Sequence, residues 1–256
     1  MNKSPIGIFD SGIGGVTIFN SIKKLLPKEN IIYLSDNLHS PYGNKSIETI
    51  KKLSQKNTEW LIEKGCKLIV VACNTATTNS VFELRSNFNL PFVGIEPAIK
   101  SAAMKTVTGK VGVLATKGTL SSNLFNSTST YHASNIEIIE ENGDGLVELI
   151  EAGIFEGVEI ENILHKHLDF MINKKIDYLV LGCTHYPLIN KVLLKILPKS
   201  VKIIDSAEAV AKQTKALLIN HKIENKSNQG EYSFYYNGDS ASLNKVLNHK
   251  FEINKI

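Results

Sequence analysis

Two cysteines stand at matching places in the two halves of the sequence. Cys73 and Cys183 each end a short apolar run, at residues 68–72 and 178–182, and each is followed by polar side chains. Such runs of Leu, Val and Ile are typical of strands that are buried on both faces of a parallel sheet. The residue after such a strand lies at its carboxyl end, where open α/β sheets bind their ligands. The sequence therefore predicts that both thiols belong to the functional site.

Two opposed thiols suit one kind of chemistry. Removing a hydrogen from the Cα of an amino acid and returning one from the opposite face requires two general acid/bases, one on each side. A cysteine at the start of a helix has a lowered pKa, so both thiols are expected to favour the thiolate. Asp10 and His185 are candidates for tuning them. The alternatives are that Asp10 only caps a helix and that His185 caps a helix or hydrogen-bonds the sheet.

The cysteines have other interpretations. Cys66 follows Gly65 in a turn between a helix and a strand, and we interpret it as a small, buried apolar residue. A metal site made of Cys73, Cys183 and His185 is a further interpretation. Because Cys-x-His is poor spacing for zinc and no Cys-x-x-Cys pair is present, no metal is predicted.

The first half of the chain has an alternating strand and helix pattern. It opens with a strand at 6–9, a Gly-rich turn at 10–15 and a helix at 16–26. The turn lets backbone N–H groups approach a small anion, but it lacks the Lys-Ser/Thr ending of a P-loop and the spacing of a dinucleotide fingerprint. A loop at 41–43 is expected to face a substrate. The other expected elements are strands at 31–34 and 91–95 and a helix at 47–64.

The pattern restarts near residue 110, where residues 110–116 resemble residues 5–11. The elements expected after it are strands at 136–139 and 201–204, helices at 145–153 and 158–171, and a helix from a cap at 205–206 to about 218. A loop at 223–230, a strand at 231–236 and a last helix form a tail that is expected to pack on the first half.

The predicted fold class is α/β, with two similar three-layer domains and mostly parallel sheets. Residues 1–95 plus 207–256 form the first domain, which carries Asp10 and Cys73. Residues 96–206 form the second domain, which carries Cys183.

Composition excludes several classes of protein. The 256 residues carry a formal charge of +4, and the lysines are scattered, so no nucleic-acid partner is predicted. No apolar run approaches the ~18 residues of a membrane-spanning helix, and the N-terminus lacks a signal peptide, so the expected location is cytoplasmic. Three cysteines are an odd number, which favours reduced thiols over a disulfide framework.

Five motifs give the sequence a resemblance to a known family. They occur in register over nearly the whole chain: DSGIGG at 10–15, PYG at 41–43, ACNTA at 72–76, VGVLAT at 111–116 and GCTHYP at 182–187. With Asp205 and Ser206 before the last helices, the chain resembles the bacterial glutamate racemases. The resemblance implies two α/β domains with the active site in the cleft between them, and most members are homodimers.

The resemblance also implies an activity. It is the cofactor-independent racemisation of L-glutamate to D-glutamate, which supplies peptidoglycan synthesis. Cys73 and Cys183 would be the two acid/bases, one per enantiomer. Asp10 would assist at the first thiol, and His185 and Glu151 at the second. Glu148 lies close to Glu151 and is the alternative for that role.

The substrate site follows from the same resemblance. Backbone N–H groups and hydroxyls suit two carboxylates, and an acidic group suits the ammonium of glutamate. The residues expected to hold the substrate are Asp10, Ser11, Pro41, Tyr42, Gly43, Asn74, Thr75, Thr116, Thr184 and His185.

Three alternatives stay open at this point. A racemase of aspartate or another amino acid would share both thiols and differ only in its side-chain pocket. A binding module would hold an anion at the Gly-rich turn without chemistry. A thiol redox protein would form a disulfide between Cys73 and Cys183 under mild oxidation. The sequence also leaves open whether a peptidoglycan precursor activates the enzyme.

Overall fold

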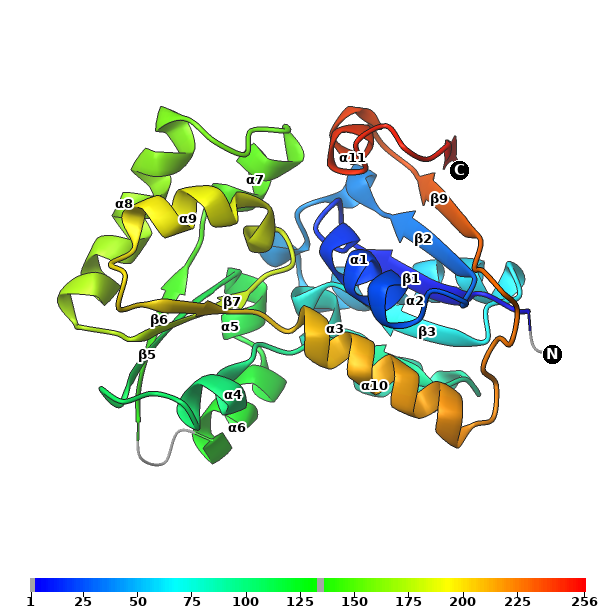
Figure 1. Cartoon of the computed structure of the whole chain (residues 1–256), viewed down its shortest axis with the longest axis horizontal. Coiled ribbons are helices and arrows are strands. Elements are labelled where there is room, and N and C mark those ends of the chain that lie inside the picture. Colours follow the sequence, from blue (N-terminus) through cyan, green and yellow to red (C-terminus); the bar gives the residue numbers. More distant parts are fainter. Residues whose placement is uncertain (1–2, 133–135) are drawn as a thin grey trace.

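Two parallel β-sheets form the framework of the protein. The structure is a computed structural model that describes residues 3–132 and 136–256. One sheet has six strands in the order β10-β9-β2-β1-β3-β4, and the other has four in the order β6-β5-β7-β8. Every strand pair in both sheets is parallel, and helices cover the faces (Figure 1). The fold class predicted from the sequence is confirmed.

The first sheet is built from both ends of the chain. Its central strand β1 (Ile6–Asp10) pairs with β2 (Ile31–Ser35) and β3 (Leu68–Val71). The C-terminal tail adds two strands beside β2. The remaining strands are β4 (Phe92–Gly94), β9 (Tyr232–Tyr236) and β10 (Ile253–Lys255), and β10 was not anticipated.

The second sheet repeats the topology of the first. Its central strand β5 (Lys110–Ala115) lies between β6 (Glu137–Asn142) and β7 (Tyr178–Gly182), with β8 (Lys202–Ile204) beyond β7. The order β6-β5-β7-β8 matches β2-β1-β3-β4 position by position. The restart of the sequence pattern at residue 110 therefore corresponds to a repeat of the strand order, and the two cysteine strands β3 and β7 are equivalents.

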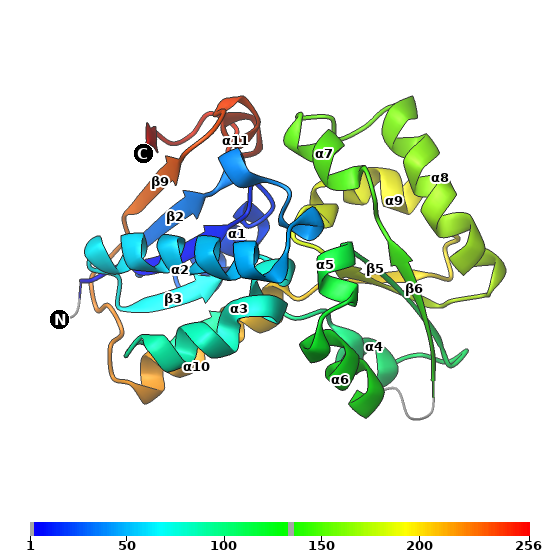
Figure 2. The same ribbon diagram turned by 180° about the vertical axis from the view of Figure 1, so that it is seen from behind.

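Helices form the outer layers. Helices α1 (Val16–Leu25) and α10 (Ala207–Asn220) contact each other on one face of the first sheet, and α2 (Ile47–Glu63) and α3 (Asn74–Asn87) cover the other (Figures 1 and 2). On the second sheet, apolar clusters place one group of helices on each face. These are α7 (Leu146–Glu151), α8 (Val158–Asn173) and α9 (Asn190–Ile196), opposite α4 (Ile99–Ala103), α5 (Lys117–Leu120) and α6 (Asn123–His132).

The connection between the second sheet and α10 differs in detail from the prediction. The Asp205 carboxylate accepts a hydrogen bond from the backbone N–H of Ala207 at 2.8 Å, as a cap should. The Ser206 side chain makes no cap hydrogen bond. Its hydroxyl donates instead to the backbone carbonyl of Glu96, which lies just after β4. Ser206 therefore joins the two segments that cross between the sheets.

A buried ion pair ties the amino end of the first sheet together. Lys67 Nζ lies 2.6 Å from Glu29 Oε2, and both side chains are only 4% exposed. Glu29 also accepts a hydrogen bond from the backbone N–H of Asn225, in the loop that leads the chain back to β9. Removing one member of such a pair leaves a buried charge without compensation.

We therefore expect Lys67→Met to lower the free energy of unfolding by about 3 kcal/mol, because the buried Glu29 carboxylate would lose its ion-pair partner. Urea unfolding measures this change. The control is Lys51→Met, which breaks the exposed pair with Glu83 and should change the free energy by less than about 1 kcal/mol. Equal effects of the two substitutions would contradict the assignment of the Lys67 pair as structural.

Candidate active site

The two thiols lie at the carboxyl ends of equivalent strands and face one cavity. Cys73 follows β3 and Cys183 follows β7, and both are about 95% buried and unpaired. The cavity between them has a volume of about 10 Å³, which is room for about one water molecule. Its lining residues are Ser11, Pro41, Tyr42, Gly43, Cys73, Asn74, Thr75, Thr116, Val147, Cys183, Thr184 and His185.

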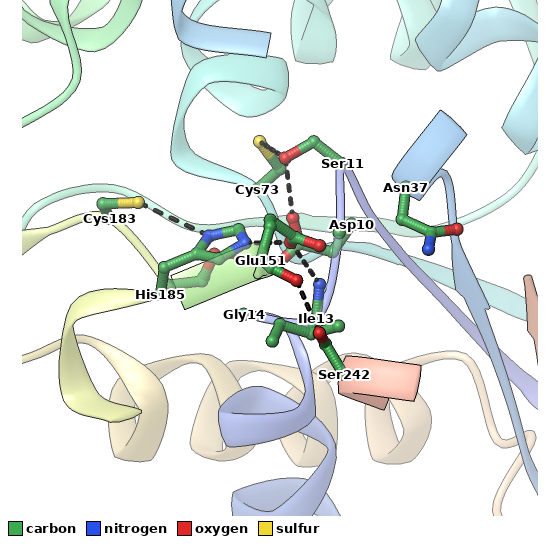
Figure 3. A network of polar contacts seen from close by, with 12 residues as sticks. Asp10, Ser11, Ile13, Gly14, Asn37, Cys73, Glu151, Cys183, His185 and Ser242 are labelled. Atoms are coloured by element: carbon green, nitrogen blue, oxygen red, sulfur yellow. Dashed lines mark hydrogen bonds and ion pairs between the residues drawn. The ribbon is translucent and has the colours of Figure 1, made fainter. Parts of the chain in front are cut away.

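A chain of hydrogen bonds connects Cys73 to Asp10. The Cys73 thiol donates to Ser11 Oγ at 3.4 Å, and the Ser11 hydroxyl donates to Asp10 Oδ1 at 3.0 Å (Figure 3). Cys73 Sγ also accepts the backbone N–H of Ala76 as the N-cap of α3. Asp10 therefore reaches the thiol through Ser11, and Ser11 acquires a connecting role that the sequence did not predict.

Burial dominates the titration of this side of the site. Burial, with a smaller contribution from the neighbouring Asp10 charge, raises the pKa of the Cys73 thiol from 9.0 to about 12. It also raises the pKa of Asp10 from 3.8 to about 6, against the lowering effects of His185 and Thr184. The expectation that a helix start favours the Cys73 thiolate is wrong for this closed site, because desolvation outweighs the helix N-terminus.

A second chain of contacts connects Cys183 to Glu151. His185 Nδ1 lies 3.7 Å from Cys183 Sγ, and His185 Nε2 lies 2.5 Å from Glu151 Oε1 (Figure 3). Burial alone would lower the pKa of His185, but the hydrogen bonds to Cys183 and Glu151 raise it well above 6.5. The imidazole is thus held as a cation between a carboxylate and a sulfur, where it stabilises negative charge on either neighbour.

Each chain of contacts includes a residue from the opposite half of the molecule. The Thr184 hydroxyl, which follows β7, donates to Asp10 Oδ2 at 2.8 Å. The backbone N–H of Ile13, which follows β1, donates to Glu151 Oε1 at 2.8 Å. The two halves therefore interlock at the site, and a shift of one half would disturb both thiols.

The Gly-rich turn after β1 makes this interlocking possible. A Cβ on Gly12 would lie 1.7 Å from Glu151 Oε1, and a Cβ on Gly14 would lie 2.7 Å from the backbone nitrogen of His185. Neither glycine has a positive φ. The turn therefore needs glycine because a side chain there would collide with the other half. The backbone N–H of Ile13, within the turn, binds the carboxylate of Glu151.

A buried carboxylate shapes the loop that carries Tyr42. Asp36 directly follows β2, is 1% exposed and accepts hydrogen bonds from Tyr42, Asn57 and Asn237. His39 Nδ1 lies 2.6 Å from Asp36 Oδ1, the oxygen that Asn237 also binds. Asp36 was not predicted as a site residue, although an acidic residue directly after a buried strand is a usable signal.

Most residues predicted from the sequence lie together at the cavity, and two lie behind it. Asp10 and Glu151 do not line the cavity. Asp10 instead hydrogen-bonds two lining residues, Ser11 and Thr184, and Glu151 contacts a third, His185. Between the two glutamates considered, Glu151 contacts His185. Glu148 is exposed and lies 3.4 Å from the Asn44 amide. Val147 lines the cavity and was not anticipated.

Polar groups in the cavity suit an anionic ligand. The hydroxyls of Thr75 and Thr116, from opposite halves, lie 2.7 Å apart, with Thr119 near both. Asn74 is buried, and neither polar atom of its amide has a hydrogen-bond partner among the described residues. An amide of this kind is costly to bury unless a ligand or water completes its hydrogen bonds.

The third cysteine lies elsewhere. Cys66 is buried beneath β1, where its Sγ would be 2.9 Å from a Cβ on Gly7, and burial raises the pKa of its thiol to about 12. Within residues 3–132 and 136–256, no group of three or more His, Cys, Asp or Glu side chains is arranged to hold a metal ion. In the same part of the chain, no helix is both long and apolar enough to cross a membrane.

Comparison with known proteins identifies the family. The family model described as Asp/Glu/Hydantoin racemase matches residues 6–214. The chain belongs to the Asp/Glu/hydantoin racemase family. It is 41% identical over 250 residues to the glutamate racemase of Ectopseudomonas mendocina, covering 96% of this chain and 95% of that protein. These racemases are isomerases, so the chain is an enzyme of that class.

Solved structures of racemases agree with this assignment. The RacE1 glutamate racemase of Bacillus anthracis superposes with a TM-score of 0.91 at 30% identity, covering 100% of this chain and 98% of the other. The glutamate racemase of Escherichia coli, in complex with L-glutamate and the activator UDP-MurNAc-Ala, gives 0.86 at 35% identity, with 98% and 97% covered. The two-domain α/β architecture of these racemases is that of this chain.

For this racemase family member, we expect Gly12→Ala to lower kcat/KM by at least about 100-fold, because the added methyl displaces Glu151 from His185 and Ile13. Racemisation kinetics and thermal unfolding measure activity and stability separately. The control is Gly65→Ala, which places a methyl in open space but at a φ of +77°. That control should lose stability by about 1 kcal/mol and remain active; an active Gly12→Ala enzyme would show that Glu151 is dispensable.

The buried carboxyl of Asp10 makes stability depend on pH. Its pKa in the folded state is about 6, above the ordinary 3.8, so the folded protein binds more protons between these values. Stability from this group is present at low pH and is lost as pH rises through about 6. A difference of about 2 in pKa corresponds to a loss of up to about 3 kcal/mol.

We therefore expect Asp10→Asn to unfold at higher urea concentration than the unmodified protein at pH 8, with the difference shrinking toward pH 4. Activity should fall in the same variant. The control is Asp177→Asn. Burial acts to raise the pKa of Asp177, but hydrogen bonds from Thr106, Val107 and Thr108 outweigh it and lower this pKa from 3.8. That substitution should destabilise at pH 8, and a stabilised Asp177→Asn or destabilised Asp10→Asn would contradict the assigned signs.

Proposed function

We propose that this chain interconverts L- and D-glutamate by direct proton transfer between Cα and two thiols, without a cofactor. The observation that carries the proposal is the pair Cys73 and Cys183, which follow equivalent strands and line one cavity from opposite halves. Two acid/bases on opposite faces of a carbon are what inversion at that carbon requires. The similarity to racemases supports glutamate as the substrate.

The proposed reaction uses the thiols in turn. For one enantiomer, the Cys73 thiolate removes the Cα hydrogen, and the Cys183 thiol gives its proton to the opposite face. For the other enantiomer the roles are exchanged. Each turnover leaves one thiol with the proton that the other has lost, so solvent exchange must restore the starting state.

Asp10, Ser11, His185 and Glu151 support these transfers in the proposal. The Ser11 hydroxyl bonds both the Cys73 thiol and Asp10, so a proton can move along this chain at the first thiol. At the second thiol, the imidazolium of His185 stabilises the sulfur when it is negative. An ammonium group entering the cavity would add positive charge near Cys73 and favour its thiolate.

The substrate is expected to bind at the polar lining between the halves. The unpartnered amide of Asn74 and the hydroxyls of Thr75, Thr116 and Thr184 can bind the carboxylates, together with the backbone near Ser11 and Gly43. Donors at the α-carboxylate also stabilise the negative charge that develops when Cα loses its proton. Because the closed cavity holds about one water, the two halves must separate to admit an amino acid.

The wider role is part of the same proposal. We infer that the D-glutamate supplies peptidoglycan synthesis in the cytoplasm, and that the enzyme works as a homodimer of chains with domains at 1–95 plus 207–256 and at 96–206. The resemblance of the motifs supports the role and the dimer, and the division of strands between the sheets supports the domain limits.

We expect the purified protein to racemise L-glutamate in heavy water, with chelator present and no pyridoxal phosphate or metal added. Optical activity should vanish, and deuterium should enter the Cα position of the product. Cys73→Ser and Cys183→Ser should each lower kcat/KM by at least about 1,000-fold, because each removes one acid/base. The matched control is Cys66→Ala, which removes the third thiol and should stay active.

The assay is repeated with UDP-MurNAc-Ala, since the Escherichia coli racemase was solved with this activator. Turnover of aspartate but not glutamate would move the substrate and keep the mechanism. Inertness toward both amino acids, with and without the precursor, would overturn the enzymatic proposal and favour an anion-binding module.

A further inference from the structure

Helix α11 (Ala241–Val246) crosses from the first sheet to the end of α7, the helix that carries Glu151. The Ser242 hydroxyl donates to the backbone carbonyl of Glu151 at 2.5 Å (Figure 3). Lys245 Nζ donates to the backbone carbonyl of Gly153 at 2.7 Å. Both contacts join residues about 90 positions apart in sequence and from different halves of the molecule.

The carbonyl that Ser242 binds is one that α7 cannot satisfy itself. Helix C-termini leave their last carbonyls without intrahelical partners. At α7, backbone N–H groups of Ala152, Gly153 and Ile154 donate to the carbonyls of residues 148, 150 and 149, and Gly153 has a φ of +78°. This is a Schellman cap, and it does not reach the carbonyl of Glu151. The hydroxyl of Ser242 fills that place.

The charge of Lys245 suits the same helix end. A cation is stabilised at a helix C-terminus, where the carbonyl dipoles point outward. The Lys245 ammonium also lies 5.0 Å from the ring centroid of Phe155. The Gly153 carbonyl, the helix dipole and the Phe155 ring therefore all favour this position of Lys245. Lys245 is exposed, so its position depends on these contacts.

The first sheet anchors α11 at both ends. Leu243 and Leu247 are buried in the large apolar core. Before the helix, Asn237 hydrogen-bonds Asp36 and the backbone N–H of Leu38, and Asn37 accepts the backbone N–H of Gly238 at 3.0 Å. The segment 237–245 therefore connects the loop that carries Tyr42 to the residue that contacts His185.

We propose that Ser242 and Lys245 are positioning residues that hold Glu151 against His185 and so set the proton transfer at Cys183. The inference rests on the proposed two-thiol racemisation. Glu151 is then fixed by its carboxylate, through Ile13 and His185, and by its backbone, through Ser242. Among the described residues, no hydrogen bond joins α11 to Cys73, Ser11 or Asp10, so the two thiols depend on this helix unequally.

The test is the double variant Ser242→Ala with Lys245→Met. We expect kcat/KM to fall by about tenfold, because the two lost hydrogen bonds act on the proton transfer only through the position of Glu151. The fall must be equal in both directions, since two enantiomers have the same free energy in water. Ser242→Thr and Lys245→Arg keep the donors and should retain most of the activity. Ser240→Ala is the matched control, because Ser240 precedes α11 and makes no side-chain cap hydrogen bond.

The deciding measurement is the isotope effect with glutamate deuterated at Cα, taken separately for each enantiomer. In the direction where Cys183 removes the hydrogen, the isotope effect on kcat/KM should rise, because that transfer becomes more rate-limiting. In the other direction Cys73 removes the hydrogen, and the effect should fall. A general loosening of the fold would move both isotope effects alike.

Unchanged activity in the double variant, or isotope effects that move together, would overturn the inference while leaving the racemase proposal intact. Lys245→Met alone repeats the test at an exposed position if the double variant unfolds, and it should give the same opposite movements in a smaller degree. Failure of the unmodified protein to racemise glutamate would overturn the proposed function itself, and that result is known before any variant is compared.

Discussion

The carboxylate of Glu151 is the contact on which the site depends. One of its oxygens accepts from the backbone of the first half at Ile13 and lies against His185 of the second half. A single acceptor atom therefore links the two halves and, together with Cys183, raises the pKa of the imidazole. This double use leaves no room for a side chain at Gly12, so the Gly-rich turn is better explained by packing against Glu151 than by phosphate binding.

The two thiols have equivalent places in the sheets but unequal surroundings. Cys73 has a neutral hydroxyl and a carboxyl behind it, and burial raises its pKa to about 12. Cys183 has a cationic imidazole beside it. Burial of Asp10 costs stability above about pH 6, where its carboxyl is ionised, whereas Cys73 stays a neutral thiol there.

Much of this arrangement could be predicted from the sequence. Apolar runs ending in Cys73 and Cys183 located two equivalent strands, and the repeat at residue 110 indicated a second copy of the topology. Side-chain contacts between the halves could not be predicted, because they depend on how two separately folded sheets approach each other. Ser11 was expected at the substrate, and its place between thiol and carboxylate is visible only in three dimensions. Ser242 carries no local signal, because its partner is a backbone carbonyl of another element.

Unequal thiols are compatible with a reaction that is symmetric. Equal free energies of two enantiomers require equal kcat/KM in the two directions, and they place no condition on the individual pKa values of the two bases. A low-energy path needs only that one sulfur can lose a proton when the other can give one. The two thiols can meet this condition in different ways. Cys73 can pass a proton toward Asp10 through Ser11, and Cys183 has a charged imidazole held by Glu151. Thr184 bonds Asp10 and Ile13 bonds Glu151, so each half of the molecule holds a carboxylate of the other. In the proposed reaction, closing of the halves would therefore prepare both thiols together.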